Sequence, residues 1–503
     1  MGKIVSIESL EKRVQLFQTT GKKVVLCHGV FDLLHPGHTL HFEEAKSQGD
    51  ILVVSVTCDK FVNKGPGRPL FSQDVRMREL AAREVVNYVV LSEYPTGVEV
   101  IRKIKPDIYA KGKDYLEEDL TRGINKEKEA IEEIGGTYYV TDTPLQSSST
   151  LINEYFSEQS DGTRQFLNGL KQSHTSNSII GKLQSLKDLR VLTIGDTIMD
   201  EYVYCDVLGA SPKDNMITAN YIDEERFPGG VLAVANHIAG FCDKVQLVTQ
   251  IGKIFPRTSL GLRDNITAQL FHSESPTITK RRFIEPDSFR KLFSIERIPR
   301  VEISRKLEDG ILDYLMENIE EYDLVLVSDF GHGLLTEGII SRLCSEAKFL
   351  AVNTQTNSAN KGFNTLNKYA RYDYTSLDEL ELRLTCQEMF QDLKKLILKV
   401  QSNSSLFRPL GDLGSVTMGK HGSLVFTKDE LYEIPNFSSK VLDTVGAGDA
   451  YLAVTSLCAA RNFEPELIGF IGNAVGALQV RWVGNKESVN PVELYKFITT
   501  LLK

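Results

Sequence analysis

Short apolar runs alternate with amphipathic stretches along most of this chain. Between residues 22 and 156, five runs have the composition of strands: 24–27, 51–56, 88–91, 107–111 and 137–141. Helical spacing of apolar residues separates them, as with Leu40, Phe42 and Ala45 after the first run. Strands that alternate with helices in this way predict an α/β domain, a parallel sheet doubly wound by helices.

The alternation stops once and then resumes over a longer region. Residues 157–187 are polar and rich in Ser, Gln and Asn, which predicts a linker that contains one short helix. Strand-like runs return at 190–195, 244–252, 324–330, 349–353, 414–418 and 423–427. They predict a second, larger doubly wound α/β domain over 188–503. The two halves share no period, so we expect a fusion of unlike domains.

Composition narrows the class of protein. The 503 residues are 42% hydrophobic and 25% charged, as in soluble globular proteins, and are too many for one ordinary core. A net charge of −9 argues against nucleic acid or an anionic membrane as the main partner. Seven scattered cysteines without a CxxC pair favour reduced thiols over disulfides or zinc. No signal peptide or membrane-length apolar run is evident, so we expect a cytoplasmic protein.

The segment CHGVFDLLHPGH at 27–38 carries the first chemical motif. His35 and His38 flank Pro36 and Gly37 in a turn between a strand and a helix. Such a turn directs backbone N–H groups and a helix N-terminus toward an anion, and two imidazoles there can donate to the same phosphate. A pair of ordinary turn histidines would also explain a bare HxGH, but the longer pattern G-x-F-D-x-x-H-x-G-H is much more specific.

This pattern resembles the nucleotidyltransferases of the cytidylyltransferase-like superfamily. The resemblance implies that His35 and His38 stabilise the triphosphate of a nucleotide donor. Lys64 and Arg68, in a Gly- and Pro-rich loop, and Lys113, after the strand at 107–111, would add positive charge; a solvated loop is the alternative for the first two. Ser148, Ser149 and Thr150 would cap a helix and contact the triphosphate. Further phosphate- or nucleotide-binding positions are implied at Gly29, Phe31, Asp32 and Gly37.

The implied reaction follows from the phosphate chemistry. A sugar 1-phosphate oxygen attacks the α-phosphorus of ATP or CTP and releases pyrophosphate, with Mg²⁺ as cofactor. Because a phosphate nucleophile is already ionised, the site needs charge neutralisation more than a strong base. The sequence does not reveal the base of the nucleotide. Glycerol 3-phosphate with CTP stays open as an alternative, and His28 replaces the asparagine of similar sequences.

The second motif is LDTVGAGDAY at 442–451. A turn whose backbone N–H groups can approach a γ-phosphate is formed by Thr444, Gly446, Ala447 and Gly448. Asp449, directly after this turn, can accept a proton from an attacking hydroxyl. The motif resembles the signature of ribokinase-like sugar kinases, which use ATP. The resemblance further implies phosphate or nucleotide contacts at Gly419, Gly422 and Asn473, sugar contacts at Asp196, Asp200, Gly229, Gly230 and Lys280, and a lid that includes 277–296. Glu379 is implied as the residue that organises Mg²⁺.

The acceptor end of this second domain departs from the family pattern. Ala233 stands in place of an amide that contacts the sugar, Ser376 in place of an asparagine, and Asn353-Thr354-Gln355 in place of aspartate-proline-lysine. A site built to hydrogen-bond one sugar discriminates strongly when such groups change. The alternatives are a different acceptor, a true heptose phosphate, or a module that has lost turnover and serves dimerisation or regulatory nucleotide binding.

Together the halves resemble the bifunctional heptose-phosphate kinase/adenylyltransferases of lipopolysaccharide-precursor synthesis, with the domain order reversed. The resemblance implies two consecutive steps toward a nucleotide-activated sugar. It also implies nucleoside triphosphates and sugar phosphates as ligands, and a homodimer.

Overall fold

The computed structural model of the chain describes residues 2–62, 68–113, 123–142, 160–253, 260–299, 301–402, 412–438 and 441–503. These divide into two compact units, one of residues 1–181 with 492–503 and one of residues 182–491. Each unit is considered by itself below. No helix among the described residues has both the length and the apolar character needed to cross a membrane.

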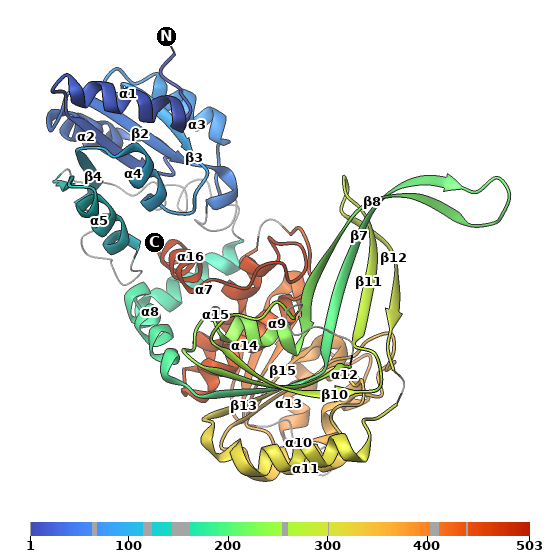
Figure 1. Cartoon of the computed structure of the whole chain (residues 1–503). Helices are drawn as coiled ribbons and strands as arrows, with labels where there is room; N and C mark the ends of the chain where they lie inside the picture. Colours follow the sequence, from blue (N-terminus) through green and yellow to red (C-terminus); the bar gives the residue numbers. More distant parts are fainter. Residues whose placement is uncertain are drawn as a thin grey trace. The chain divides into compact units, whose positions relative to one another are not determined.

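A five-stranded parallel sheet in the order β3-β2-β1-β4-β5 forms the first unit (Figure 1). Successive side chains of β1 point to opposite faces, so Val24 and Leu26 pack under α1 and α4 while Val25 and Cys27 pack under α2 and α3. Both faces are therefore covered, and the predicted doubly wound fold is confirmed. The elements are α1 (Ile7–Thr19), β1 (Val24–Gly29), α2 (Pro36–Ser47), β2 (Ile51–Thr57), α3 (Gln73–Ala81), β3 (Tyr88–Ser92), α4 (Val98–Ile104), β4 (Ile108–Gly112), α5 (Gly123–Glu133) and β5 (Thr137–Thr141).

The region expected to be a linker is more ordered than its composition predicts. Two helices, α7 (Asp161–Ser173) and α8 (Ser176–Gln184), occupy most of the described part of 157–187, where one short helix was expected. Ser160 caps α7 by accepting from the Thr163 N–H at 3.2 Å. Leu167 and Leu170 give α7 a buried apolar stripe, which the many polar residues around them obscured.

A nine-stranded sheet in the order β10-β9-β6-β13-β14-β15-β16-β17-β18 forms the centre of the second unit; the pairs β16–β17 and β17–β18 are antiparallel, and the other neighbouring pairs are parallel. Helices α10 to α13 pack on one face, and α9, α14 and α15 pack against the other. The strands are β6 (Val191–Gly195), β9 (Val245–Gly252), β10 (Ile266–Ser273), β13 (Leu324–Asp329), β14 (Leu350–Thr354), β15 (Tyr374–Asp378), β16 (Leu413–Thr417), β17 (Ser423–Thr427) and β18 (Leu431–Ile434).

The helices of this unit follow the strands in the doubly wound pattern. They are α9 (Val231–Ile238), α10 (Arg305–Asn318), α11 (Glu337–Glu346), α12 (Glu379–Cys386), α13 (Leu393–Ser402), α14 (Ala447–Ala460) and α15 (Pro465–Gln479). A last helix, α16 (Pro491–Leu501), belongs mostly to the first unit.

A separate four-stranded sheet in the order β12-β11-β7-β8 extends from the second unit, with β7 and β8 as a long antiparallel ribbon (Figure 1). Its strands are β7 (Thr197–Ala210), β8 (Ile217–Gly230), β11 (Ile278–Glu285) and β12 (Arg290–Arg297). We call it the lid sheet. It contains the lid strands expected within 277–296, whereas the runs of 197–230 were too polar toward their exposed ends to be recognised as strands.

Candidate active sites

The HxGH segment forms the entry to α2 in the first unit. His35 is the N-cap residue and His38 the third residue of the helix, with ring centroids 4.1 Å apart. The His35 N–H donates to Nδ1 of His38 at 3.4 Å, so a neutral His38 ring carries its proton on Nε2. Phe31, at φ 53°, turns its ring edge-on to His38 at 5.5 Å. Gly37 is buried in the first turn of α2, so the two imidazoles and the helix N-terminus occur at one place.

The Asp32 carboxylate holds the backbone of Leu70 and Phe71, which follow the Gly- and Pro-rich loop. The carboxylate, 5% exposed, accepts hydrogen bonds from the N–H groups of Leu70 and Phe71 at 2.7 and 3.0 Å. Arg68 pairs with the same carboxylate at 3.4 Å. Both residues were expected to contact the nucleotide, and the geometry gives Asp32 a positioning role instead. Lys64 lies outside the described residues.

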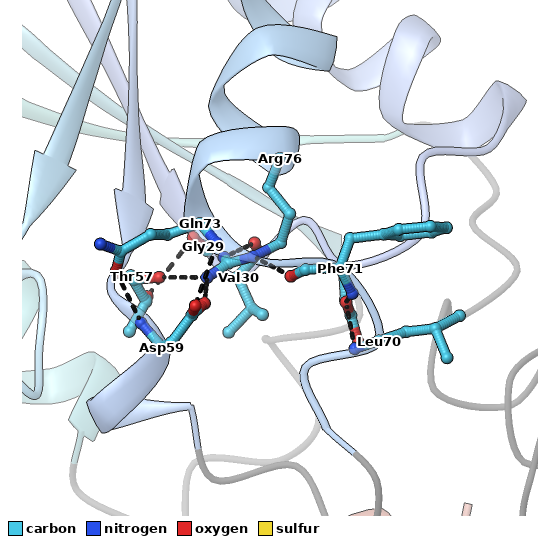
Figure 2. Close-up of polar contacts among 9 residues, drawn as sticks. Gly29, Val30, Thr57, Asp59, Leu70, Phe71, Gln73 and Arg76 are labelled. Carbon is cyan, nitrogen blue, oxygen red and sulfur yellow. Dashed lines mark hydrogen bonds and ion pairs between the residues drawn. The ribbon is translucent and has the colours of Figure 1, made fainter.

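The side chain of Arg76 connects the backbone around the HxGH turn to two other segments (Figure 2). This residue was not identified from the sequence. Its guanidinium donates to the backbone oxygens of Val30, Thr57 and Phe71 and pairs with Asp59 at 2.6 Å. The phosphate turn, the end of β2 and the segment after the basic loop are thereby joined through one buried side chain. The sequence signal that could have identified it is an arginine on the face of α3 that also carries the buried apolar residues Met77 and Leu80.

A buried ionic cluster lies at the carboxyl ends of β1 and β4. The Lys111 ammonium contacts Glu127 at 3.2 Å and donates to the His28 carbonyl oxygen at 3.2 Å. Burial would raise the pKa of Glu127, but Lys111, His28 and hydrogen bonds from Tyr109 and Gly97 lower it to about 2. Burial and Lys111 lower the pKa of His28 to about 4, so this ring is neutral near pH 7.

Lys113 and the serine-threonine element complete the predicted set in this unit. Lys113 is exposed just beyond β4 and pairs with Asp142 at 2.5 Å. It therefore lies at the carboxyl edge of the sheet, where Gly29 ends β1. Ser148, Ser149 and Thr150 lie outside the described residues.

Most of the predicted kinase residues line one cavity of about 880 Å³ in the second unit. It lies between the N-terminus of α14, the carboxyl ends of β14 to β16, and the lid sheet. Open α/β sheets bind ligands at this edge. The predicted residues that line it are Asp200, Gly230, Lys280, Gly419, Gly422, Thr444, Gly446, Ala447, Gly448, Asp449 and Asn473; Asp196, Gly229 and Glu379 do not.

The GAGD turn is held in place by Asp443, three residues before its first glycine. The buried Asp443 carboxylate accepts from the Tyr202 hydroxyl at 2.7 Å and from the Gly484 N–H at 3.0 Å, and it pairs with Lys291 at 2.6 Å. Gly446 caps α14 at φ 83°, and a Cβ there would lie 1.9 Å from Asn485 Oδ1. Only glycine fits this position.

Asp449 stands in the first turn of α14 and faces the cavity. Burial and then the nearby Asp200 carboxylate raise the pKa of Asp449 to about 7, although Lys280 opposes the shift. A carboxyl group with a pKa near neutrality can accept a proton at physiological pH and release it again, as a general base must.

The lid sheet supplies charge at the same end of the cavity. Arg282, not identified from the sequence, forms an ion pair with Asp200 over the ring of Tyr202. Gly229 lies against Asp200, since a Cβ on Gly229 would meet its Oδ2 at 2.5 Å. Burial lowers the pKa of Lys280, opposed by Asp200 and Glu296. One carboxylate and two cations therefore face the cavity at this end.

Asp196 and Glu379 are next to the cavity but are not among the residues that line it. Asp196 accepts from the N–H groups of Phe330 and His332, at 3.2 and 3.3 Å, and so orders the loop after β13. Glu379 pairs with Arg383 one helical turn further along α12, at 2.8 Å. The cavity is lined instead by Asp378. Sugar contact by Asp196 and metal organisation by Glu379 are therefore not what this geometry favours.

The far end of the cavity is built around α15. The Asn473 amide donates to the carbonyl oxygens of Ile434 and Pro435, both at 3.0 Å. A Cβ on Gly422, which has φ 86°, would meet the Ile434 oxygen at 2.1 Å. Asn473 thus fixes a cavity wall through its side chain, and close backbone packing explains the glycine at 422.

Two family models match the chain: Cytidylyltransferase-like over residues 26–155 and pfkB family carbohydrate kinase over residues 341–492. The bifunctional protein HldE of Methylobacillus flagellatus is 37% identical over 155 residues, which are 30% of this chain and 31% of that protein. HldE of Aliarcobacter butzleri is 42% identical over 119 residues, 23% of this chain and 25% of that protein. The chain thus matches less than a third of the length of these relatives.

Among solved structures, phosphofructokinase-2 from Escherichia coli in complex with potassium matches with a TM-score of 0.51 and 14% identity. The match covers 62% of this chain and 99% of that chain, and at this identity it bears on the fold alone. The second unit has the ribokinase-like fold that the sequence predicts. The chain therefore joins a cytidylyltransferase-like domain to a carbohydrate kinase domain of the pfkB family, in that order.

Proposed function

We propose that the chain is a bifunctional enzyme in which residues 22–156 transfer a nucleotidyl group and residues 188–503 phosphorylate a sugar or sugar phosphate with ATP. The observation that carries the proposal is Asp449, half-buried at the N-terminus of α14 and facing an 880 Å³ cavity. A general base beside a glycine turn is what phosphoryl transfer to a hydroxyl requires.

In the kinase domain, Asp449 takes the proton from the acceptor hydroxyl as that oxygen attacks the γ-phosphorus of ATP, and ADP leaves. The N–H groups at the start of α14 stabilise charge on the transferred phosphoryl group. Lys280 and Arg282 hold an anionic acceptor at the lid, which favours a sugar phosphate over a neutral sugar.

In the first domain, His35, His38, Lys64 and Lys113 stabilise the charge that develops as a sugar 1-phosphate attacks ATP or CTP and pyrophosphate leaves. Arg76 and Asp32 hold the segments that carry these groups. Similarity to HldE over 155 residues supports a heptose-like precursor of a surface polysaccharide, such as lipopolysaccharide, as the sugar.

Mg²⁺ is the proposed cofactor of both steps. Among the described residues, no three His, Cys, Asp or Glu side chains are arranged to hold a metal ion. This fits Mg²⁺, which one or two carboxylates and the substrate phosphates commonly hold. In the kinase cavity Asp378 would supply the carboxylate, and the ion would neutralise phosphate charge.

One alternative retains a specific observation in its favour. Asn353, Gln355 and Ser376 stand where the resemblance expects aspartate, lysine and asparagine, and Glu379 is paired with Arg383. A degenerate kinase module, kept for dimerisation or regulatory nucleotide binding and joined to a glycerol-3-phosphate-type cytidylyltransferase, would account for these changes.

A screen of the full-length protein separates the two functions. ATP and CTP are crossed with sugar phosphates, sugar 1-phosphates and glycerol 3-phosphate, and ADP and pyrophosphate are measured separately. Both products, each with its own acceptor, are expected. Pyrophosphate from CTP and glycerol 3-phosphate alone, with ATP bound but not consumed, would favour the alternative.

We further assign the protein to the cytoplasm and to a homodimer. All seven cysteines are buried and unbridged, which agrees with a reducing compartment. Both edge strands of the lid sheet carry exposed apolar side chains, Ile217 and Tyr221 on β8 and Phe293 and Ile295 on β12, and burying such side chains stabilises an association. Light scattering should give twice the chain mass.

A further inference from the structure

Asn485 lies in the loop between α15 and α16 and has no role in the function described so far. It lines the kinase cavity and is 6% exposed. Its neighbour Gly484 donates its N–H to Asp443, the residue that anchors the GAGD turn. Asn485 is therefore held by the same contact that positions the anion-binding turn.

The two ends of the Asn485 amide have different surroundings. Its Oδ1 is enclosed, accepts no hydrogen bond from a described residue, and lies against Gly446. Its Nδ2 also makes no hydrogen bond within the described part of the chain. Unlike Oδ1, however, Nδ2 is accessible from outside the protein interior. Because the residue is nearly buried and lines the cavity, the accessible side of Nδ2 opens into the cavity.

The space beside this amide suits an anion. A Cβ placed on Gly448 would have no atom within 4 Å, so there is free space beside the first turn of α14 at this residue. There is no such space at Gly446, which lies against Asn485. The backbone N–H groups of that turn and the positive end of the helix dipole already favour negative charge there. Rotating the amide by 180° would bring Oδ1 toward the same space, and a phosphate would disfavour that orientation.

We propose that Asn485 donates a hydrogen bond from Nδ2 to the phosphate chain of ATP, beside the Gly446 turn. The inference rests on the proposed kinase function, because it takes ATP as the nucleotide of this cavity. A primary amide reaching a phosphate oxygen makes a charge-assisted hydrogen bond, which is stronger than one between neutral groups.

Calorimetric titration of the full-length protein with ATP, ADP and adenosine tests the assignment. Asn485→Ala should lower ATP affinity by about ten- to hundredfold, the effect of losing one hydrogen bond to a charged group, and leave adenosine affinity within about twofold. Asn485→Asp keeps the size but sets a negative charge against the phosphates, so its loss of ATP affinity should be larger. The control is Asn236→Ala, which removes another buried amide of this unit, bonded to Gly261 and Arg263 away from the cavity.

Two results would overturn the assignment. ATP affinity could stay at the parent level in both Asn485 variants, or adenosine affinity could fall as much as ATP affinity, which would mean that Asn485 only shapes the cavity. A parent protein that binds no ATP would refute the kinase donor and this inference together. A parent that binds ATP but phosphorylates no acceptor would refute kinase turnover alone, and the titrations would still decide the role of Asn485.

Discussion

At the scale of single residues, the two domains solve different chemical problems with different groups. In the proposed kinase reaction the acceptor is a hydroxyl, which must lose a proton, and desolvation raises the pKa of Asp449, the proposed base, to about 7. The proposed nucleotidyl acceptor is already an anion, and the groups proposed to act on it in the first domain are imidazoles and lysines. The types of side chain at each site follow from the ionisation state of the nucleophile.

Asp449 makes kinase activity depend on pH. The carboxylate form is active, so ADP formation should rise with pH through about 7 and level off above it. Asp449→Asn should reduce turnover by about 10²–10⁴-fold, the contribution of a general base, with ATP affinity nearly unchanged. Steady-state rates across pH and ATP titration of both proteins measure this. An Asp449→Asn protein with parental turnover of a sugar phosphate would place the base elsewhere.

His35→Ala and His38→Ala should each slow pyrophosphate release by about 10²–10³-fold, as for loss of one preorganised donor to the transition state. Folding should persist, because the pair lies at a helix entry rather than in the core clusters. Circular dichroism checks the fold, and His174→Ala, at the end of α7, serves as the control. Near-parental rates in both variants would contradict the assigned roles.

At the scale of elements, hydrophobic periodicity predicts the strands and helices that are buried and misses those that are solvated and polar. The apolar strands β1 to β5 were all anticipated, since each lies under helices on both faces. The long ribbon of β7 and β8 was missed because its outer part is solvated and reads as a polar segment. Helix α7 was missed as a full helix because few apolar residues stand out in a Ser-, Gln- and Asn-rich stretch.

The two motifs likewise located both sites but not the residues that hold the motif turns in place. The HxGH and GAGD turns are local in sequence, so their residues could be chosen from the chain alone. Arg76 acts through backbone oxygens from three segments, and Asp443 through donors from β7, β12 and the loop after α15. Such contacts depend on the folded register, which no spacing encodes. The family resemblance implied Glu379 as the residue that organises Mg²⁺, and it could not show that the neighbouring Asp378 lines the cavity.

Glu127 on α5 joins three elements and should stabilise the first unit in a pH-dependent way. Its pKa falls from 4.5 to about 2 on folding, so its contribution is present above about pH 4.5 and is lost as pH falls through 2. Glu127→Gln removes the carboxylate that pairs with the buried Lys111 ammonium and should cost about 3–5 kcal/mol near pH 7. Urea unfolding at several pH values measures the difference between variant and parent. A difference that does not shrink below pH 4.5 would contradict the account.

At the scale of the whole molecule, each proposed site is complete within its own unit. The described residues around the HxGH turn all belong to the first unit, and every residue that lines the kinase cavity belongs to the second. The two reactions should therefore be separable by mutation within one polypeptide. The proposed function joins two steps on related substrates, a phosphorylated sugar in one step and its activated form in a later one.

The most direct measurement assays both products in three full-length proteins: the parent, His38→Ala and Asp449→Asn. With ATP and CTP supplied alongside sugar phosphates and sugar 1-phosphates, the parent should form both ADP and pyrophosphate. His38→Ala should lose pyrophosphate release and keep ADP formation, while Asp449→Asn should do the reverse. A parent that forms neither product, or variants in which both products fall together, would contradict the claim that this chain carries two independent transferase sites.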